Sequence, residues 1–272
     1  MKLIYNDEYQ TVDSSMSDSN IGARKYKNII NHLFIINGVI NEAIKTKKKA
    51  IDIEIMDYRQ CFDSMWLEEV INDLYEAGIK NDKLAIIYEA NRINKVSVQT
   101  PHGPSERVSI NKIVMQGETM APLECSVQVD TIGKECIEEN KFLYYYKNLV
   151  PVPPLAMVDD HVAVSNCGTE AVEMNAYLNA KTNLKKLQFG EEKCHKMHVG
   201  EEKAFCPELF IDQWRVKSIS EIDTEFTLVD EIGELYKIDI SKEEKYLGGR
   251  TLDQGVCRHR GVLVVRKRGG RD

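Results

Sequence analysis

The chain has 272 residues, of which 43% are hydrophobic and 29% are charged, and its formal net charge is −7. This composition excludes collagen-like, mucin-like and wholly disordered proteins, and the length suits one large domain or two small ones. The seven cysteines show no Cys-x-x-Cys spacing, which favours a reducing compartment over a secreted disulfide scaffold. The acidic balance also argues against a nucleic-acid-binding surface that extends over the whole chain.

Neither a signal peptide nor a membrane span is expected. The first ten residues, MKLIYNDEYQ, lack the apolar run of a signal peptide. The most apolar stretch, IINHLFIINGVI, is interrupted by polar residues well short of the roughly 18 residues that a membrane helix needs. We therefore expect an intracellular protein that does not enter a membrane.

The first half of the chain predicts a loop, a long helix, a strand and two further helices. SSMSDSN is typical of a loop, and apolar residues at helical spacing predict a helix over residues 28–43. AIDIEIM alternates isoleucine with acidic residues, which predicts a strand ending in Asp57. Helical patterns follow over residues 64–78 and 82–91, and PHGPSE between two β-rich segments predicts a hairpin.

The second half adds two helices and more strands. A helix is expected from Pro122 to about residue 138, with proline in its first turn. PVPPLAMVDDHVAVS predicts two strands joined by a tight turn at Asp159 and Asp160. A helix over residues 169–187 and several short strands over residues 193–246 complete the pattern. Strands that alternate with helices and are followed by more strands predict an α+β domain with an antiparallel sheet.

Three carboxylates lie at the ends of predicted strands, namely Asp57, Asp159 and Asp160. If these strands are neighbours, the carboxylates converge and repel one another unless a cation or a proton compensates. Hard oxygen ligands favour Mg²⁺, and a two-metal site promotes in-line displacement at phosphorus. The pattern alone also fits a plain interpretation, in which the Asp-Asp pair is a turn and Asp57 ends a strand.

Several blocks together resemble, in their order, the motifs of reverse transcriptases, and the non-LTR (LINE-type) retrotransposon enzymes most of all. The blocks are NIGARKYKNIINHLFIINGVIN, DYRQCFDSM, QGETMAPL, MVDD, LQFGEEKCHKMHVG and KYLGG. The resemblance covers roughly residues 10–250 and implies an α+β right-hand polymerase, with fingers and an antiparallel palm sheet packed on helices. It implies a partial fingers segment (1–50), a palm (51–250) with a fingers insertion at about 80–115, and a basic tail (251–272) without a recognisable thumb.

The resemblance also implies a role for each matched residue. Asp57 and Asp159 match the two main metal ligands, and Asp160 matches the second aspartate of the pair. Lys193 falls where the family has a lysine near the leaving pyrophosphate, which makes it a candidate general acid. Phe62 falls where an aromatic ring lies under the sugar, excludes a 2′-hydroxyl and thereby favours deoxynucleotides.

Two further sets of residues match substrate contacts of the family. The set matched to the nucleotide and the template phosphates is Gln116, Gly117, Arg24 and Lys25. The set matched to the hairpin that holds the primer terminus is Tyr246, Leu247 and Gly248.

Two positions depart from the family pattern. Met157 stands two residues before the Asp pair, where the family usually has an aromatic residue, and primer positioning depends on that place. His161 follows the pair, where an apolar strand residue is commoner. The tail VCRHRGVLVVRKRGGRD does not resemble the family.

The function implied is the RNA-directed DNA polymerase core of a LINE-like retroelement. It adds dNTPs to a primer 3′-hydroxyl by two-metal phosphoryl transfer, with two Mg²⁺ ions, or Mn²⁺ in their place, as cofactors. An RNA template, a DNA primer and dNTPs are the expected partners. The alternative is a truncated, non-catalytic reverse-transcriptase remnant that folds and at most binds nucleic acid; Met157 and His161 favour it, whereas the intact carboxylates favour activity.

Two other classes of site are weaker candidates. Cys194, His195, His198 and Cys206 are loosely compatible with zinc, but no second knuckle accompanies them. A two-metal nuclease would use the same carboxylates, although it leaves Phe62 and the QG block without a role.

Overall fold

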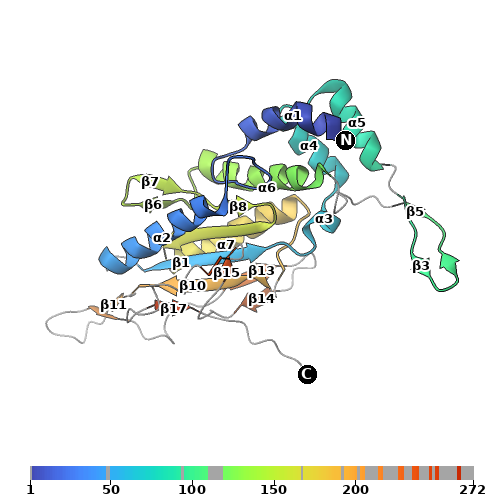
Figure 1. Ribbon diagram of the computed structural model, residues 1–272. Helices are drawn as coiled ribbons and strands as arrows, with labels where there is room; N and C mark the ends of the chain where they lie inside the picture. The colour runs from blue at the N-terminus through green and yellow to red at the C-terminus, as the bar shows by residue number, and fades with distance from the viewer. Residues whose placement is uncertain are drawn as a thin grey trace.

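A computed structural model describes residues 2–46, 50–92, 95–109, 119–166, 168–190 and 193–200, together with short strands after residue 200. Within these residues, helices pack on a central antiparallel sheet (Figure 1). The predicted α+β class is therefore confirmed.

The central sheet has five strands in the order β17-β10-β1-β9-β8, and every neighbouring pair is antiparallel. Its strands are β1 (Ile51–Asp57), β8 (Leu155–Met157), β9 (Asp160–Asn166), β10 (His195–Val199) and β17 (Val262–Val264). β1 occupies the middle and ends at Asp57, as predicted. β17 falls within the basic tail, where the sequence predicts no strand, and it pairs with β10 at the edge of the sheet.

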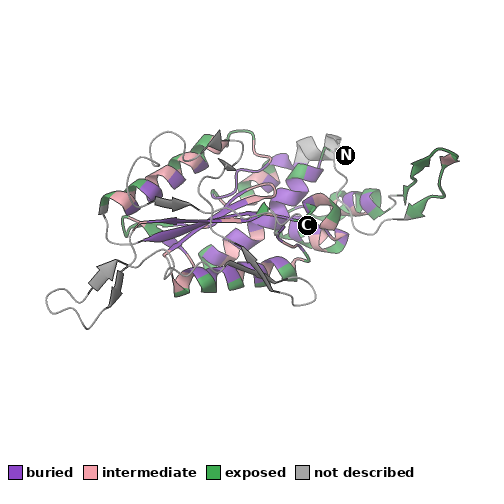
Figure 2. Cartoon of the chain, turned by 90° about the horizontal axis from the view of Figure 1, so that it is seen from below, coloured by how far each residue is buried: buried purple, intermediate pink, exposed green. Residues whose placement is uncertain are grey.

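One face of the sheet is covered by α2 (Ile29–Thr46), the long helix predicted from its apolar spacing. Ile51, Ile53 and Ile55 of β1 pack with this helix in one hydrophobic cluster. The alternation of the strand suggests one buried and one exposed face, but residues 51–56 are all buried, including the acidic Asp52 and Glu54. Figure 2 shows the strands of the sheet as a buried layer inside the fold.

The opposite face packs on α6 (Ala121–Glu138) and α7 (Thr169–Leu184). Met56 of β1, Ala163 of β9 and Cys194 belong to the hydrophobic cluster on this side. Helices on both faces leave β1 without a solvent-facing side, so its polar residues need partners inside the protein.

The remaining helices gather beside α6 (Figure 1). They are α1 (Lys2–Ser15), α3 (Cys61–Ser64), α4 (Leu67–Glu76) and α5 (Asn81–Arg92). The loop predicted at SSMSDSN begins two residues later than expected, because Ser14 and Ser15 complete the last turn of α1. None of the described helices is long and apolar enough to cross a membrane.

Small hairpins complete the described residues. The predicted hairpin around PHGPSE is confirmed: β2 (Lys95–Val96) pairs with β5 (Val108–Ser109), and β3 (Gln99–Thr100) with β4 (Gly103–Pro104). Together they form an exposed arm that projects from the body (Figures 1 and 2). The other pairs are β6 (Tyr144–Tyr146) with β7 (Val150–Val152), β11 (Lys203–Phe205) with β12 (Trp214–Val216), β13 (Phe226–Val229) with β14 (Leu235–Ile238), and β15 (Lys245–Tyr246) with β16 (Gly249–Arg250).

Candidate active site

The structure brings the three candidate carboxylates together at one end of the central sheet. Asp57 is the last residue of β1, and Asp160 is the first residue of β9. The two are direct partners across the antiparallel β1–β9 pair. Asp159 precedes Asp160 in the turn that joins β8 to β9. We call Asp57, Asp159 and Asp160 the carboxylate cluster.

The turn lies one residue earlier than predicted. Met157 pairs with Asp160, so the two turn residues are Val158 and Asp159, and Asp160 already belongs to β9. Val158 has a φ of 57°, a left-handed conformation that is a genuine outlier for a β-branched residue. A positive φ at the first of two turn residues is the pattern of a type II′ hairpin, in which glycine is usual. Backbone strain of this kind is characteristic of functional sites.

Burial and the repulsion among the negative charges of the cluster raise the pKa of Asp160. The pKa of Asp160 is raised to about 6, first because the carboxyl is buried and then because Asp159 and Asp57 are close, whereas Lys193 opposes the shift. The cluster therefore favours a cation or a proton. As they stand, the described residues present no group of three His, Cys, Asp or Glu side chains that could hold a metal ion.

Lys193 supplies a positive charge to this site. Its ammonium nitrogen lies 3.0 Å from Asp57 Oδ1 and 3.0 Å from Oδ2. The preceding loop is tied to the end of β1, because the Gly190 N–H donates to the Asp57 carbonyl at 2.8 Å. The Lys193 N–H in turn donates to the Gly190 carbonyl at 3.0 Å. These two bonds place the lysine beside the cluster.

Phe62 lies in α3, on the turn that follows β1. Its side chain is partly buried and packs against the large hydrophobic cluster on the α6 side. It therefore has a packing role while keeping part of its ring accessible.

An aromatic group beneath the site was not anticipated from the sequence. Tyr58 is fully buried and stacks on Phe189, with ring centroids 4.8 Å apart, and meets His161 edge to face at 5.2 Å. Burial lowers the pKa of His161 to about 3, so its ring is neutral. The unusual residue after the Asp pair is thus accommodated as a core aromatic. The signals in the sequence were the position of Tyr58 directly after Asp57 and the unusual His161 directly after the Asp pair.

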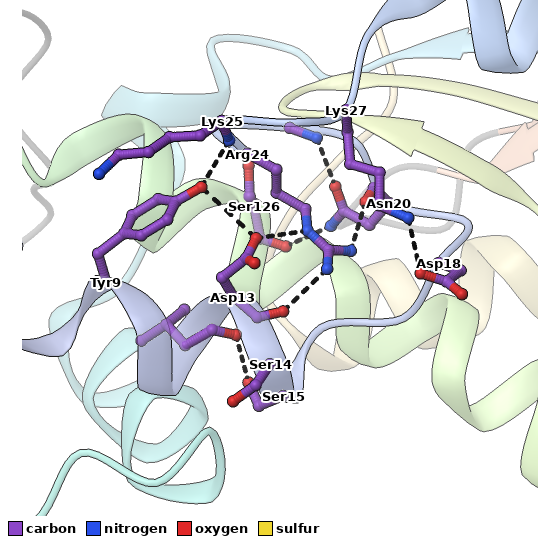
Figure 3. Close-up of polar contacts among 12 residues, drawn as sticks. Tyr9, Asp13, Ser14, Ser15, Asp18, Asn20, Arg24, Lys25, Lys27 and Ser126 are labelled. Carbon is purple, nitrogen blue, oxygen red and sulfur yellow. Dashed lines mark hydrogen bonds and ion pairs between the residues drawn. The ribbon is translucent and has the colours of Figure 1, made fainter.

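Arg24 lies in a partly buried network of the segment between α1 and α2 (Figure 3). Its Nε lies 2.7 Å from Asp13 Oδ1, and its other nitrogens donate to the carbonyls of Asp13, Ser17 and Asn20. Only 8% of its side chain is exposed. In this structure Arg24 orders its own segment, and its contact with a nucleotide stays a prediction.

Lys25 is exposed, in contrast to its neighbour. Its ammonium lies 4.6 Å from the centre of the Tyr9 ring, and its backbone N–H donates to the Tyr9 hydroxyl at 2.6 Å (Figure 3). The charge is therefore accessible to a phosphate.

Four other candidates, Gln116, Gly117, Leu247 and Gly248, lie outside the described residues. Tyr246 lies in β15, whose backbone pairs with β16. Their roles stay predictions.

The zinc hypothesis gains nothing from the structure. The His198 Nδ1 lies 2.8 Å from Asp52 Oδ1 inside the protein, and Cys194 is buried. Cys206 lies outside the described residues. The part of the chain that the structure describes contains no metal-binding group around these side chains.

Comparison with solved structures shows a shared fold. Telomerase from Candida tropicalis, in complex with a TWJ fragment of telomeric RNA, superposes with a TM-score of 0.55 at 13% identity, over 80% of this chain and 37% of that one. The apo telomerase of the same organism, truncated from its C-terminal domain, gives 0.53 at 12% identity, over 80% and 45%. The chain thus spans less than half the length of these telomerases.

The sequence itself matches a known family. The family described as "Reverse transcriptase (RNA-dependent DNA polymerase)" matches residues 2–250. No curated protein matches the sequence. With almost the whole chain matched and the fold shared, the protein belongs to the reverse transcriptase family.

Proposed function

We propose that this chain is the fingers and palm part of an active RNA-directed DNA polymerase from a LINE-like retroelement. The convergence of Asp57, Asp159 and Asp160 at the end of the central sheet, with Lys193 beside them, carries this proposal. The LINE-like assignment rests on the six sequence blocks taken together and in their order. The substrates are a DNA primer, an RNA template and dNTPs.

By chemical type the donors of the carboxylate cluster suit a divalent cation, although the described side chains, as they stand, do not form a group of three around one position. All three side chains of the cluster are carboxylates, which Mg²⁺ prefers, and the pKa of Asp160 is raised first by burial and then by the negative charges of Asp159 and Asp57. Asp57 and Asp159 would hold two Mg²⁺ ions, or Mn²⁺, with Asp160 adjacent. Such ions stabilise the attacking and leaving oxygens of the transfer at phosphorus.

The residues around the cluster donate a proton, contact the sugar and neutralise phosphate charge. The primer 3′-hydroxyl attacks the α-phosphate of the dNTP, and pyrophosphate leaves. The Lys193 ammonium carries a proton that it can give to the leaving pyrophosphate oxygen. Phe62 contacts the sugar and excludes a 2′-hydroxyl, and Lys25 neutralises a backbone phosphate.

The other matched residues keep the roles that the resemblance implies. Those assigned to the nucleotide and template are Gln116, Gly117 and Arg24. Those assigned to the primer terminus are Tyr246, Leu247 and Gly248.

A second candidate is a non-catalytic chain that binds nucleic acid without extending it. The observation that favours it is the ion pair itself, because the Lys193 ammonium contacts both oxygens of Asp57 where a metal ion would bind.

Primer extension separates the two candidates. We expect the chain to extend an oligo(dT) primer on an RNA template with Mg²⁺ and dNTPs. Asp159→Asn should abolish extension, whereas Glu138→Gln, which changes an exposed acid at the end of α6, should retain it. Circular dichroism establishes that each variant is folded. A folded chain that shifts primer–template in a gel without extending it supports the non-catalytic candidate.

A further inference from the structure

The segment between α1 and α2, residues 16–28, lies against the strand that leads into the Val158–Asp159 turn. We call it the α1–α2 loop. The Ile21 N–H donates to the Ala156 carbonyl at 2.9 Å, and the Ala156 N–H donates to the Ser19 carbonyl at 3.0 Å. Asn20 thereby forms a parallel bridge with Ala156 of β8. The loop adds one short pairing to the edge of the central sheet, two residues before the turn.

Asn20 connects the loop to α6. Its side chain is buried, and its Nδ2 donates to the Ser126 carbonyl at 2.8 Å. Its Oδ1 accepts a hydrogen bond from the Gly22 N–H at 2.8 Å. Ser126 and Asn20 appear together in Figure 3. One amide side chain therefore holds the bend of the loop and fixes it to a rigid helix.

Gly22 brings the loop backbone against the turn itself. A Cβ at this position would lie 2.5 Å from the backbone nitrogen of Val158 and 2.4 Å from Ser126 Oγ. Such distances are far below a normal van der Waals contact, and the Val158 nitrogen is backbone that cannot rotate away. Only glycine fits between α6 and the turn.

Arg24 holds the loop from its other side. Its guanidinium contacts the Asp13 carboxylate and carbonyl at the end of α1 and the Asn20 carbonyl (Figure 3). It also donates to the Ser17 carbonyl. Asp130 of α6 accepts hydrogen bonds from the Ser17 N–H and hydroxyl. The loop is thus held by α1, by α6 and by its own buried arginine.

We infer that Asn20, Gly22 and Arg24 are positioning residues that hold the Val158–Asp159 turn in its catalytic geometry. Val158 has a left-handed backbone, which is strained for a β-branched residue and persists only where the surroundings enforce it. The α1–α2 loop provides these surroundings, because it is hydrogen-bonded to Ala156 in the strand before the turn and leaves no room for a Cβ between Gly22 and the Val158 nitrogen. The inference rests on the proposed function only for the use of the Asp159 carboxylate in catalysis.

The test compares two glycine substitutions in the full chain. Gly22→Ala forces the loop away from Val158, whereas Gly38→Ala in α2 places its Cβ 3.8 Å from the nearest atom, a ring carbon of Tyr146. Amide hydrogen exchange of residues 155–160, followed by mass spectrometry, reports whether the turn remains braced. We expect exchange there to be at least about tenfold faster in Gly22→Ala and unchanged in Gly38→Ala.

Extension kinetics then test the positioning role. In Gly22→Ala, kcat should fall by about 100-fold while KM for the dNTP changes little, because misplaced catalytic groups slow the chemical step. Arg24→Lys is a milder second variant, which keeps the charge but loses the multiple carbonyl contacts. Because Arg24 is also matched to a nucleotide or template contact, this variant is compared by hydrogen exchange, and residues 155–160 should exchange faster in it to a smaller degree. If Gly22→Ala does not fold, hydrogen exchange in Arg24→Lys still tests whether the loop holds the turn.

The outcomes are distinct. If hydrogen exchange over residues 155–160 is unchanged in folded Gly22→Ala and Arg24→Lys, the α1–α2 loop does not hold the Val158–Asp159 turn. Faster exchange with an unchanged kcat overturns the positioning role. A wild-type chain that does not extend a primer contradicts the proposed function, and the exchange comparison still decides whether the loop braces the turn.

Discussion

The ammonium nitrogen of Lys193 lies 3.0 Å from both carboxylate oxygens of Asp57, the residue at which the central strand ends. Half of the lysine side chain is exposed, against 21% for Asp57. Partly exposed ion pairs contribute about 1 kcal/mol or less, so a divalent ion can displace the lysine from the carboxylate. A displaced Lys193 remains within reach of whatever phosphate the site binds.

Replacing Lys193 with methionine should therefore have two opposite effects. Binding of Mn²⁺, followed by electron paramagnetic resonance, should strengthen by about fivefold. The reason is that the metal no longer has to displace the Lys193 ammonium from Asp57, an ion pair that contributes roughly 1 kcal/mol. The rate of primer extension at saturating metal should fall by about 100-fold, because the proton donor is lost. Lys141→Met, which removes an exposed lysine paired with Glu139, serves as the control. Unaltered Mn²⁺ affinity in the Lys193 variant contradicts the competition.

Phe62→Val should weaken discrimination between deoxynucleotides and ribonucleotides. The partly buried ring packs on the core, and its shortening opens space where the sugar is proposed to lie. We expect the ratio of kcat/KM for dNTP over rNTP to fall by about tenfold or more. Ile71→Val is the matched control, because Ile71 is also partly buried against the same cluster. Equal ratios in both variants would refute the sugar contact.

Much of the fold follows from periodicity in the sequence. The alternation of isoleucine with acidic residues predicted β1, and the apolar spacing predicted α2 on which those isoleucines pack. The strand pattern placed Asp57 near Asp159 and Asp160 only on the condition that their strands are neighbours, and the resemblance to reverse transcriptases implied that condition. These features are local in the chain or fixed by strand pairing, so a single sequence carries them.

The rest depends on contacts that sequence spacing does not encode. Asp52 and Glu54 are buried, because Lys196, His198 and Asn175 supply their polar partners from other elements. The turn could not be placed correctly, since valine is disfavoured at a positive φ. The brace by the α1–α2 loop joins residues more than a hundred positions apart, and nothing in SSMSDSN or NIGAR identifies what they contact.

Removing only one partner of the buried ion pair between β1 and β10 should lower the free energy of unfolding more than replacing both partners. Lys196 Nζ lies 2.9 Å from Asp52 Oδ2, and each side chain is only 1% exposed. Lys196→Met leaves the Asp52 carboxylate short of a partner, and we expect urea unfolding to show a loss of about 3–5 kcal/mol. Asp52→Asn combined with Lys196→Met should recover part of that loss. Lys141→Met, which removes an exposed lysine, is the control. If Lys196→Met lowers the free energy of unfolding no more than this control does, the buried ion pair does not contribute as expected.

Glu54 should make the free energy of unfolding depend on pH. The pKa of this carboxyl is raised from 4.5 to about 8, chiefly by burial and also by the neighbouring Asp52, while Lys196 and the Asn175 amide oppose the shift. The folded state therefore keeps a proton that the unfolded state loses, so stability falls as the pH rises from about 4.5 to about 8. Glu54→Gln retains the acceptor for the Asn175 Nδ2 donor, which lies 2.7 Å from Oε1, and removes the titration. In urea unfolding across this range, the difference between wild type and Glu54→Gln should grow with pH in favour of the variant, by at most about 1.4 kcal/mol per pH unit. A difference that stays constant with pH means that Glu54 is already ionised in the folded chain.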